Sequence, residues 1–161
     1  PAEGWTKGHA AGSVGNGAGN AGGGVVLRDH MGAFRAGACH LFSGVSDPEV
    51  AELLACRRAL EVARDLNMLR VHVELDAKGV VHMLQVPGKE LSVAGPLVEE
   101  IKMMLRSFEE FKVSWIRRSA NIAAHKFARV AVGDELCKVW LGAPPDFVLS
   151  VLSDEIPNTI S

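Results

Sequence analysis

The sequence predicts a mixed α/β domain with one hydrophobic core. A chain of 161 residues is long enough for one domain. Its composition, 48% hydrophobic and 22% charged, is that of an ordinary globular protein. Stretches in which apolar residues recur at every second position alternate with stretches in which they recur at helical spacing. In chain order these stretches read β-β-β-α-β-α-α-β-α, an order that packs helices against a mixed sheet.

A glycine-rich segment leads into the first strands, since nine of the 17 glycines precede Val25. Residues 4–7 favour the start of a strand, and we expect the glycines from Gly12 onward to weaken its pairing and leave a flexible approach to a hairpin. The apolar run 23–29, a turn and the run 33–42 predict that hairpin.

The first long helix has two possible N-caps. Ser46 is one, with Glu49 closing a capping box, and Asp47 is the other, with Pro48 at the first helical position. Apolar residues recur along one face of this helix as far as Asn67.

The remaining elements follow from the same two periods. Residues 71–76 alternate apolar and polar side chains, which predicts a strand with one polar face. After it we expect a weak helix over 77–86, a stronger helix over 96–111, a strand over 113–116 and a helix over 121–132. We take residues 1–133 as the domain and residues 134–161 as a looser tail that packs on it or extends from it, with a turn or helix over 147–152.

Composition also excludes several classes of protein. The longest apolar runs fall far short of a membrane span, and no secretory signal opens the chain, so we expect no membrane contact. Three cysteines without a Cys-x-x-Cys pair favour free thiols and an intracellular setting, cytoplasmic or nuclear. Because the chain starts at Pro1, we expect it to be a segment of a longer protein. A net charge of −2 restricts any nucleic-acid contact to a local patch.

Common site motifs are absent from the sequence or misplaced in it. Gly17-x-Gly19-x-x-Gly22 has the spacing of a dinucleotide fingerprint, but it precedes a strand instead of opening a helix. The histidines do not have the spacing of a two-ligand zinc motif, and no serine lies in Gly-x-Ser-x-Gly.

Two carboxylates and a histidine remain as candidate site residues. Glu52 lies in the second turn of the first helix, Asp76 ends the following strand on its polar side, and His125 lies in the last predicted helix. Taken singly, each is an ordinary solvated or turn residue. Their order along the chain is what draws attention to them.

That order resembles the plant ribonuclease H-like domain, which occurs alone or at the C-terminal end of retrotransposon-derived reverse transcriptase proteins. The likeness covers nearly the whole chain and implies a ribonuclease H-like fold, a five-stranded mixed sheet flanked by helices. It rests on Gly4-Trp5-Thr6-Lys7, Val26-Leu27-Arg28-Asp29-x-x-Gly32, Ala51-Glu52-x-x-Ala55, Val73-Glu74-Leu75-Asp76, Arg118-x-Ala120-Asn121-x-x-Ala124-His125-x-x-Ala128, and Trp140 before Pro144-Pro145.

The resemblance implies a site in which acidic residues hold two magnesium ions that cut a phosphodiester, with manganese as a substitute. Glu52 and Asp76 match the second and third acids, and His125 matches the fourth position. The first acid is missing: the family reads Lys-x-Asn-x-Asp-Gly-Ser where this chain has Ala11 at the aspartate position. We therefore expect Glu52 and Asp76 to hold metal weakly.

Three functions stay open at this point. The domain is a nucleic-acid-binding relative with an impaired active site, an active RNA–DNA hybrid ribonuclease, or a protein-interaction module on the same fold. The expected nucleic acid is RNA–DNA hybrid or double-stranded RNA. The candidate contacts, which also suit a solvated helix face, are Asn121 and the basic residues Arg117, Arg118, Lys126 and Arg129.

Overall fold

The computed structural model describes residues 4–15 and 19–155. These residues form six strands, five α-helices and one short 3₁₀ helix. Pro1 and Gly17 lie outside these described residues. The elements are β1 (Trp5–Val14), β2 (Asn20–Arg28), β3 (Phe34–Ser43), α1 (Pro48–Asp65), β4 (Arg70–Leu75), α2 (Lys78–Gln85), α3 (Gly95–Arg106), β5 (Glu110–Trp115), η1 (Arg118–Ala120), α4 (Ile122–Gly133), β6 (Lys138–Leu141) and α5 (Asp146–Glu155).

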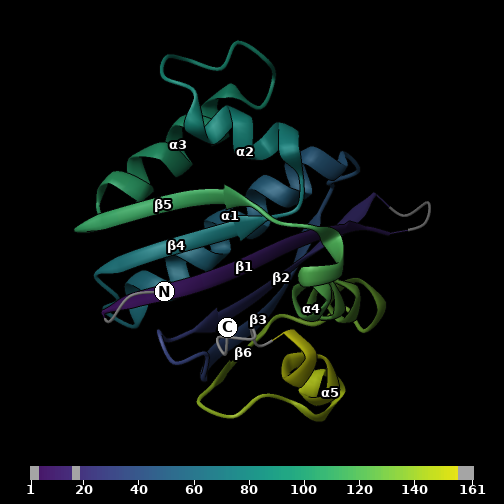
Figure 1. The fold of residues 1–161 in the computed structure, drawn as a ribbon. Helices are drawn as coiled ribbons and strands as arrows, with labels where there is room; N and C mark the ends of the chain where they lie inside the picture. The colour runs from purple at the N-terminus through teal and green to yellow at the C-terminus, as the bar shows by residue number, and fades with distance from the viewer. Residues whose placement is uncertain (1–3, 16–18, 156–161) are drawn as a thin grey trace.

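The strands form one mixed sheet in the order β5-β4-β1-β2-β3-β6 (Figure 1). Strand β1 pairs antiparallel with β2 and parallel with β4, so it lies at the centre of the sheet. The predicted α/β class with a mixed sheet and flanking helices is confirmed. The expected number of strands is wrong, because residues 138–141 of the tail add β6 to the free edge of β3.

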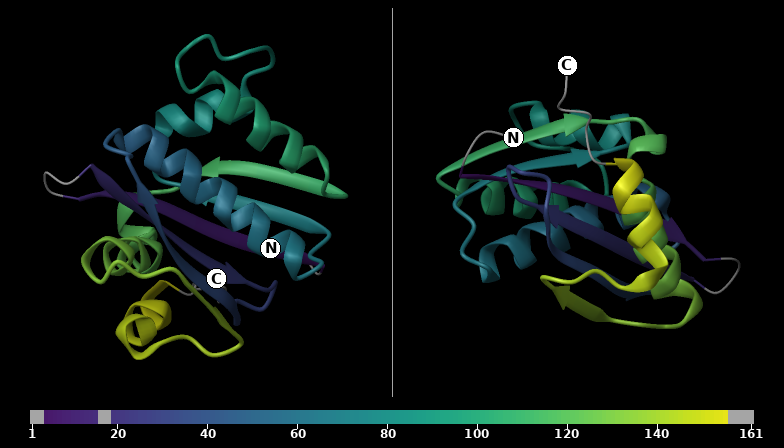
Figure 2. Two further views of the ribbon diagram at one scale, coloured as in Figure 1. Left: turned by 180° about the vertical axis from the view of Figure 1, so that it is seen from behind. Right: turned by 60° about the horizontal axis from the view of Figure 1, so that its bottom comes forward.

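Helices cover both faces of the sheet. Helix α1 crosses the rear face (Figure 2), where it shares the larger apolar core with α2 and α3. Helices α4 and α5 lie on the other face over a smaller core, in which Phe127, Trp140 and Phe147 stack edge to face or tilted. The face of β4 and β5 on this second side carries no helix (Figure 1).

Glycines in β1 and β2 allow the helices to approach the sheet closely. A Cβ atom at Gly12 would lie 2.6 Å from the backbone of Ala51 and Glu52 in α1. A Cβ at Gly24 would collide with the carbonyl oxygen of Ala124 in α4. The expected weakening of strand pairing from Gly12 onward is wrong for the described residues. Strand β1 pairs with β2 as far as Val14, and helix backbone lies where a side chain at Gly12, Gly22 or Gly24 would have to fit.

Several element boundaries differ from the sequence prediction. The helix expected over 96–111 ends at Arg106, where Ser107 and Phe108 donate to the carbonyls of Met104 and Leu105 and tighten the last turn. The chain then enters β5 at Glu110. None of the described helices has both the length and the apolar character required to cross a bilayer.

Replacing Gly24 by alanine tests the close approach of α4. The added methyl group must displace the backbone of α4, so we expect Gly24→Ala to lower the free energy of unfolding by about 2 kcal/mol or more in urea denaturation. The matched control is Gly133→Ala, because a Cβ at Gly133 meets nothing within 4 Å. Equal stability of the two variants would contradict this packing.

Candidate active site at the carboxyl end of β4

Three elements bring Glu52, Asp76 and His125 into one cleft. Glu52 comes from the second turn of α1, Asp76 directly follows β4, and His125 comes from the second turn of α4. They line a hollow of about 380 Å³ together with Arg118. The residues that the sequence singled out therefore meet at one end of the sheet, on the open side of β4.

Glu52 is fixed by the start of its helix. Asp47 is the N-cap of α1, since its carboxylate accepts from the amide of Glu49 (2.8 Å) with Pro48 in the first turn, so the second of the two proposed registers is observed. One turn later, Glu52 Oε2 accepts from the amide of Gly12 in β1 (3.0 Å). Among the described residues, its other oxygen, Oε1, is buried and has no hydrogen-bond partner.

Burial dominates the ionisation of Glu52. The residue is 4% exposed. Loss of solvation raises the pKa of its carboxyl to about 8, aided by the negative charge of Asp76 and opposed by the Gly12 amide and by Arg118. Glu52 is consequently protonated for the most part at neutral pH, and it contributes little negative charge to the cleft.

Asp76 is ionised and paired with His125. Burial raises the pKa of Asp76, but the hydrogen bond and charge of His125 outweigh it, with help from Arg118 and Asn121, so that its pKa lies below the ordinary value. His125 Nε2 donates to Asp76 Oδ2 at 2.6 Å. One oxygen of the most acidic group in the cleft is thus already engaged.

These donors do not fit two magnesium ions. Ala11 has no exposed surface and packs beside Val26, Ala124 and Phe127 in the smaller core, so the first position of the implied site offers no oxygen. One oxygen of Asp76 is already bonded to His125. Within the described residues, no group of three or more His, Cys, Asp or Glu side chains is arranged to hold a metal ion.

Asn121 and Glu155 fix the start of α4. Asn121 is fully buried, and its amide donates to the carbonyl of Ala10 (3.0 Å) instead of capping the helix. Glu155, the last residue of α5, accepts from the amide of Ala123 (2.9 Å) and pairs with buried Arg28 (3.0 Å). The C-terminal helix therefore supplies the carboxylate that the positive end of α4 requires. No sequence pattern revealed this contact, which spans 32 residues.

The basic residues singled out by the sequence fall in two places. Arg118 lines the cleft with Asp76, and Arg117 precedes it at the start of η1, where both side chains are exposed. Lys126 and Arg129 instead line a separate hollow of about 360 Å³ beside Phe147 of α5.

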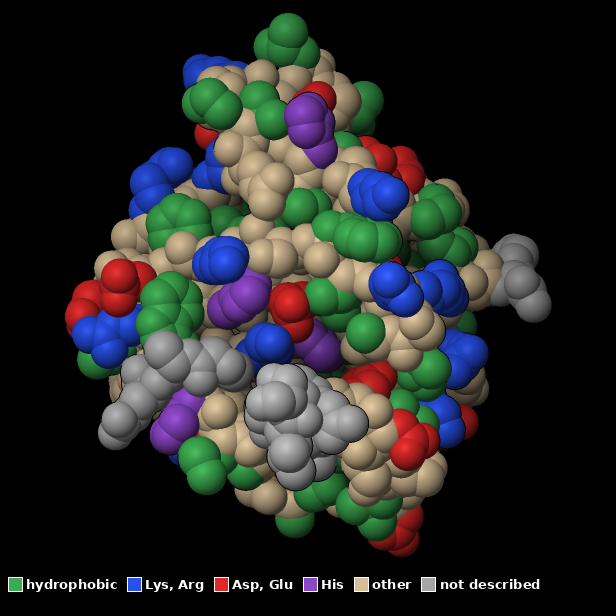
Figure 3. Space-filling model, in the orientation of Figure 1, with side chains coloured by type: hydrophobic (Ala, Val, Ile, Leu, Met, Phe, Trp, Pro, Cys, Tyr) green, Lys and Arg blue, Asp and Glu red, His purple; other side chains and the backbone are tan. Residues whose placement is uncertain are grey.

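A polar network that sequence reasoning missed covers the open face of β1 and β4. Glu74 accepts from His9 (2.9 Å) and pairs with Lys7 (3.3 Å), while His72 lies 2.8 Å from the hydroxyl of Ser114. Burial raises the pKa of Glu74, but the hydrogen bond from His9 and the nearby cations lower it to about 2. Acidic, basic and histidine side chains are interspersed across the middle of this face (Figure 3). The alternation of apolar and polar residues over 71–76 was the sequence signal that could have indicated this network.

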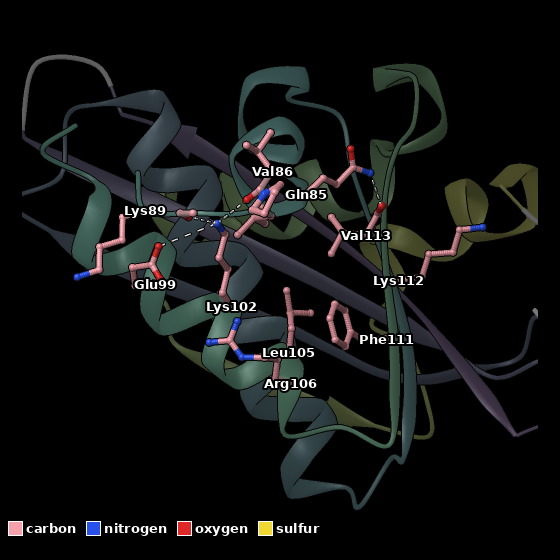
Figure 4. A pocket seen from close by; sticks show the side chains of 13 residues that line it. Gln85, Val86, Lys89, Glu99, Lys102, Leu105, Arg106, Phe111, Lys112 and Val113 are labelled. Carbon is pink, nitrogen blue, oxygen red and sulfur yellow. Dashed lines mark hydrogen bonds and ion pairs between the residues drawn. The ribbon is translucent and has the colours of Figure 1, made fainter. Parts of the chain in front are cut away.

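A further hollow lies away from this cleft. A groove of about 610 Å³ separates the α2–α3 loop and α3 from β5 (Figure 4). Lys102 donates to the carbonyls of Val86 and Gly88 (2.8 and 2.9 Å), and Gln85 donates to that of Val113 (2.8 Å). These bonds satisfy backbone carbonyl groups of the α2–α3 loop and of β5. The groove shares no lining residue with the cleft of Glu52 and Asp76.

The raised pKa of Glu52 predicts a pH-dependent stability. Since the folded state holds this proton more tightly than the unfolded chain, the free energy of unfolding should fall as pH rises from 4.5 to about 8. Glu52→Gln keeps an acceptor for the Gly12 amide and removes the ionisation. We expect this variant to be as stable as the parent near pH 4.5 and more stable, by on the order of a few kcal/mol, near pH 8.

Urea denaturation across this pH range measures the difference between the two proteins. Glu49→Gln is the matched control, because Glu49 is an exposed carboxylate that lines the same cleft. A loss of stability in Glu52→Gln at neutral pH would mean that the ionised carboxylate is a structural acceptor.

Comparisons with known proteins agree with the fold. The model of the reverse transcriptase-like family matches residues 9–131. None of the curated proteins matches the chain. RNase H1 from the halophilic archaeon Halobacterium salinarum has a TM-score of 0.70 and 21% identity, over 81% of this chain and 98% of that one.

Two further solved structures are similar. The N-terminal RNase H domain of a Mycobacterium tuberculosis protein, solved as a fusion with maltose-binding protein, has a TM-score of 0.71 and 22% identity over 81% of this chain and 94% of that one. LC11-RNase H1 was isolated from compost and solved with an RNA/DNA hybrid. It has a TM-score of 0.72 and 21% identity over 81% of this chain and 98% of that one. The chain therefore belongs to the reverse transcriptase-like family and has the ribonuclease H fold.

Proposed function

We propose that this domain binds RNA–DNA hybrid or double-stranded RNA without base specificity and that its hydrolytic centre is impaired. The observation that carries the proposal is Ala11, which stands where the resemblance implies the first metal-binding aspartate. RNA-containing duplexes are recognised by shape, phosphates and 2′-hydroxyls across the minor groove, so binding does not need the missing acid. We also propose that the domain has the plant, retrotransposon-related origin that the resemblance implies.

The charges in the cleft support binding over cleavage. Ionised Asp76 is balanced by His125 and by Arg118, and Glu52 is mostly neutral. Glu49 also lines the cleft, so the negative charge there is reduced and not removed, and the cleft repels phosphates less than a cluster of three ionised carboxylates would. One of the similar structures, LC11-RNase H1, was solved with an RNA/DNA hybrid. The three cysteines are unpaired thiols, which supports an intracellular setting for this binding.

One observation favours an active hybrid ribonuclease as the second candidate. Glu52 Oε1 is buried, close to Asp76, and has no hydrogen-bond partner among the described residues. An orphaned carboxylate oxygen at the end of β4 is a ready ligand for a hard cation. In that case Glu52 must lose its proton when a metal ion binds.

Cleavage of a labelled RNA–DNA hybrid separates the two candidates. We expect the parent protein to bind the hybrid and to give no product with magnesium or manganese. Ala11→Asp adds the missing oxygen ligands, and we expect it to raise cleavage by about tenfold or more over the parent. Efficient cleavage by the parent would overturn the impairment.

The stability of Ala11→Asp is its internal control. Because Ala11 is fully buried, we expect the unpaired carboxylate to lower the melting temperature in the presence of a chelator, and magnesium to restore part of the loss by binding the folded state. Ala11→Asn, which has nearly the same shape and no charge, should not respond to magnesium. If magnesium does not raise the melting temperature of Ala11→Asp, position 11 does not share a metal site with Glu52 and Asp76.

Salt dependence tests the phosphate contacts of the cleft rim. Each phosphate contact contributes about −0.9 to the slope of log K against log salt. We expect Arg117→Ala combined with Arg118→Ala to weaken hybrid binding and to reduce the steepness of that slope by about one to two. Electrophoretic shifts or fluorescence anisotropy at several salt concentrations measure both effects.

The comparison variant carries Lys126→Ala with Arg129→Ala, which removes the same charge from the separate hollow beside α5. A smaller effect in this variant supports binding at the cleft. If the parent protein does not bind hybrid at low salt, or if neither double variant changes the affinity, the protein-interaction alternative is favoured.

A further inference from the structure

Trp115 is an exposed aromatic residue fixed beside the candidate site. It ends β5 and is 43% exposed. Its indole N–H donates to the backbone carbonyl of Asp76 at 3.1 Å. Since Asp76 lines the carboxylate cleft, this bond holds the ring at the edge of the cleft. A tryptophan with its polar atom satisfied and its ring partly exposed presents a rigid apolar surface to solvent.

Cations flank this surface. The ammonium of Lys78, the first residue of α2, lies 4.6 Å from the centre of the Trp115 ring. Arg118 lines the same cleft as Asp76. Both side chains are exposed, and neither forms an ion pair with a carboxylate within the described part of the chain. In the same orientation as Figure 1, hydrophobic side chains lie among lysine and arginine side chains on this face (Figure 3).

We infer that Trp115 and Lys78 form a stacking site for an unpaired nucleobase, with Lys78 and Arg118 contacting the phosphates on either side. This inference rests on the proposed function and adds a substrate feature to it: a single-stranded extension next to the duplex. Every base presents an aromatic face, so stacking on tryptophan tolerates any sequence, and the neighbouring cations match the backbone charge.

A purely structural role leaves the exposure of Trp115 unexplained. The bond to Asp76 joins the end of β5 to the residue that follows β4, but it uses only the indole N–H and leaves the ring 43% exposed. The aromatic cluster of Phe127, Trp140 and Phe147 shows the alternative, since those rings pack against one another beside α4. Trp115 faces solvent and has Lys78 as its cationic partner.

Tryptophan fluorescence gives a direct test. The chain contains three tryptophans and no tyrosine, so tryptophan dominates its emission. We expect oligothymidylate to quench the emission of the parent protein, and we expect the quenching to disappear in Trp115→Phe. Trp140→Phe is the matched control and should keep the quenching, because Trp140 packs beside Phe127. Quenching that survives in Trp115→Phe would overturn the inference.

Affinity measurements separate this inference from the proposed function. Fluorescence anisotropy compares a blunt RNA–DNA hybrid with the same hybrid carrying a single-stranded extension. We expect the extension to tighten binding by about tenfold, and we expect Trp115→Ala and Lys78→Met to abolish this gain while leaving binding of the blunt hybrid within about twofold. Equal binding of the two hybrids by the parent protein would overturn the stacking site and leave the proposed function standing. If the parent protein binds neither hybrid but oligothymidylate still quenches its emission, the proposed function is overturned and the stacking site stands.

Discussion

The approach of two helices to glycine backbone is the constraint on which the candidate site depends. Helix α1 comes close enough to β1 for the Gly12 amide to reach Glu52, and α4 comes close enough to β2 to press on Gly24. A side chain at either glycine would separate helix from strand. The same approach carries His125 to Asp76 at the end of β4, so one packing arrangement assembles the cleft from opposite faces of the sheet.

Electrostatics then decide what the cleft can do. Burial of Glu52 outweighs the opposing charge of Arg118 and the hydrogen bond from the Gly12 amide, so the protonated carboxyl is favoured. Asp76 keeps its charge because His125 pairs with it. Arg118 lines this cleft, and the indole of Trp115 is bonded to the backbone carbonyl of Asp76 at its edge.

Much of this arrangement is readable in the sequence, and the exceptions have physical causes. The period of residues 71–76 and the order of the motifs predicted β4, the fold class and the candidates Glu52, Asp76 and His125. The glycines of β2 looked flexible because nothing local shows the helix backbone that covers them. Strand β6 has four residues and, among the described strands, pairs only with β3, so its sequence shows almost no alternation of apolar and polar residues. Contacts such as Glu155 with Ala123 depend on tertiary packing alone.

The protonation state of Glu52 tests the central claim most directly, which is that this cleft holds a neutral carboxyl where a metal-binding acid would be charged. Carbon-13 labelling of the glutamate carboxyls, with Glu52→Gln used to assign the resonance, allows NMR to follow this group through a pH titration. The account predicts a midpoint at about 8 that stays in place when magnesium is added. A midpoint near the ordinary value of 4.5, or a large downward shift with magnesium, would contradict it.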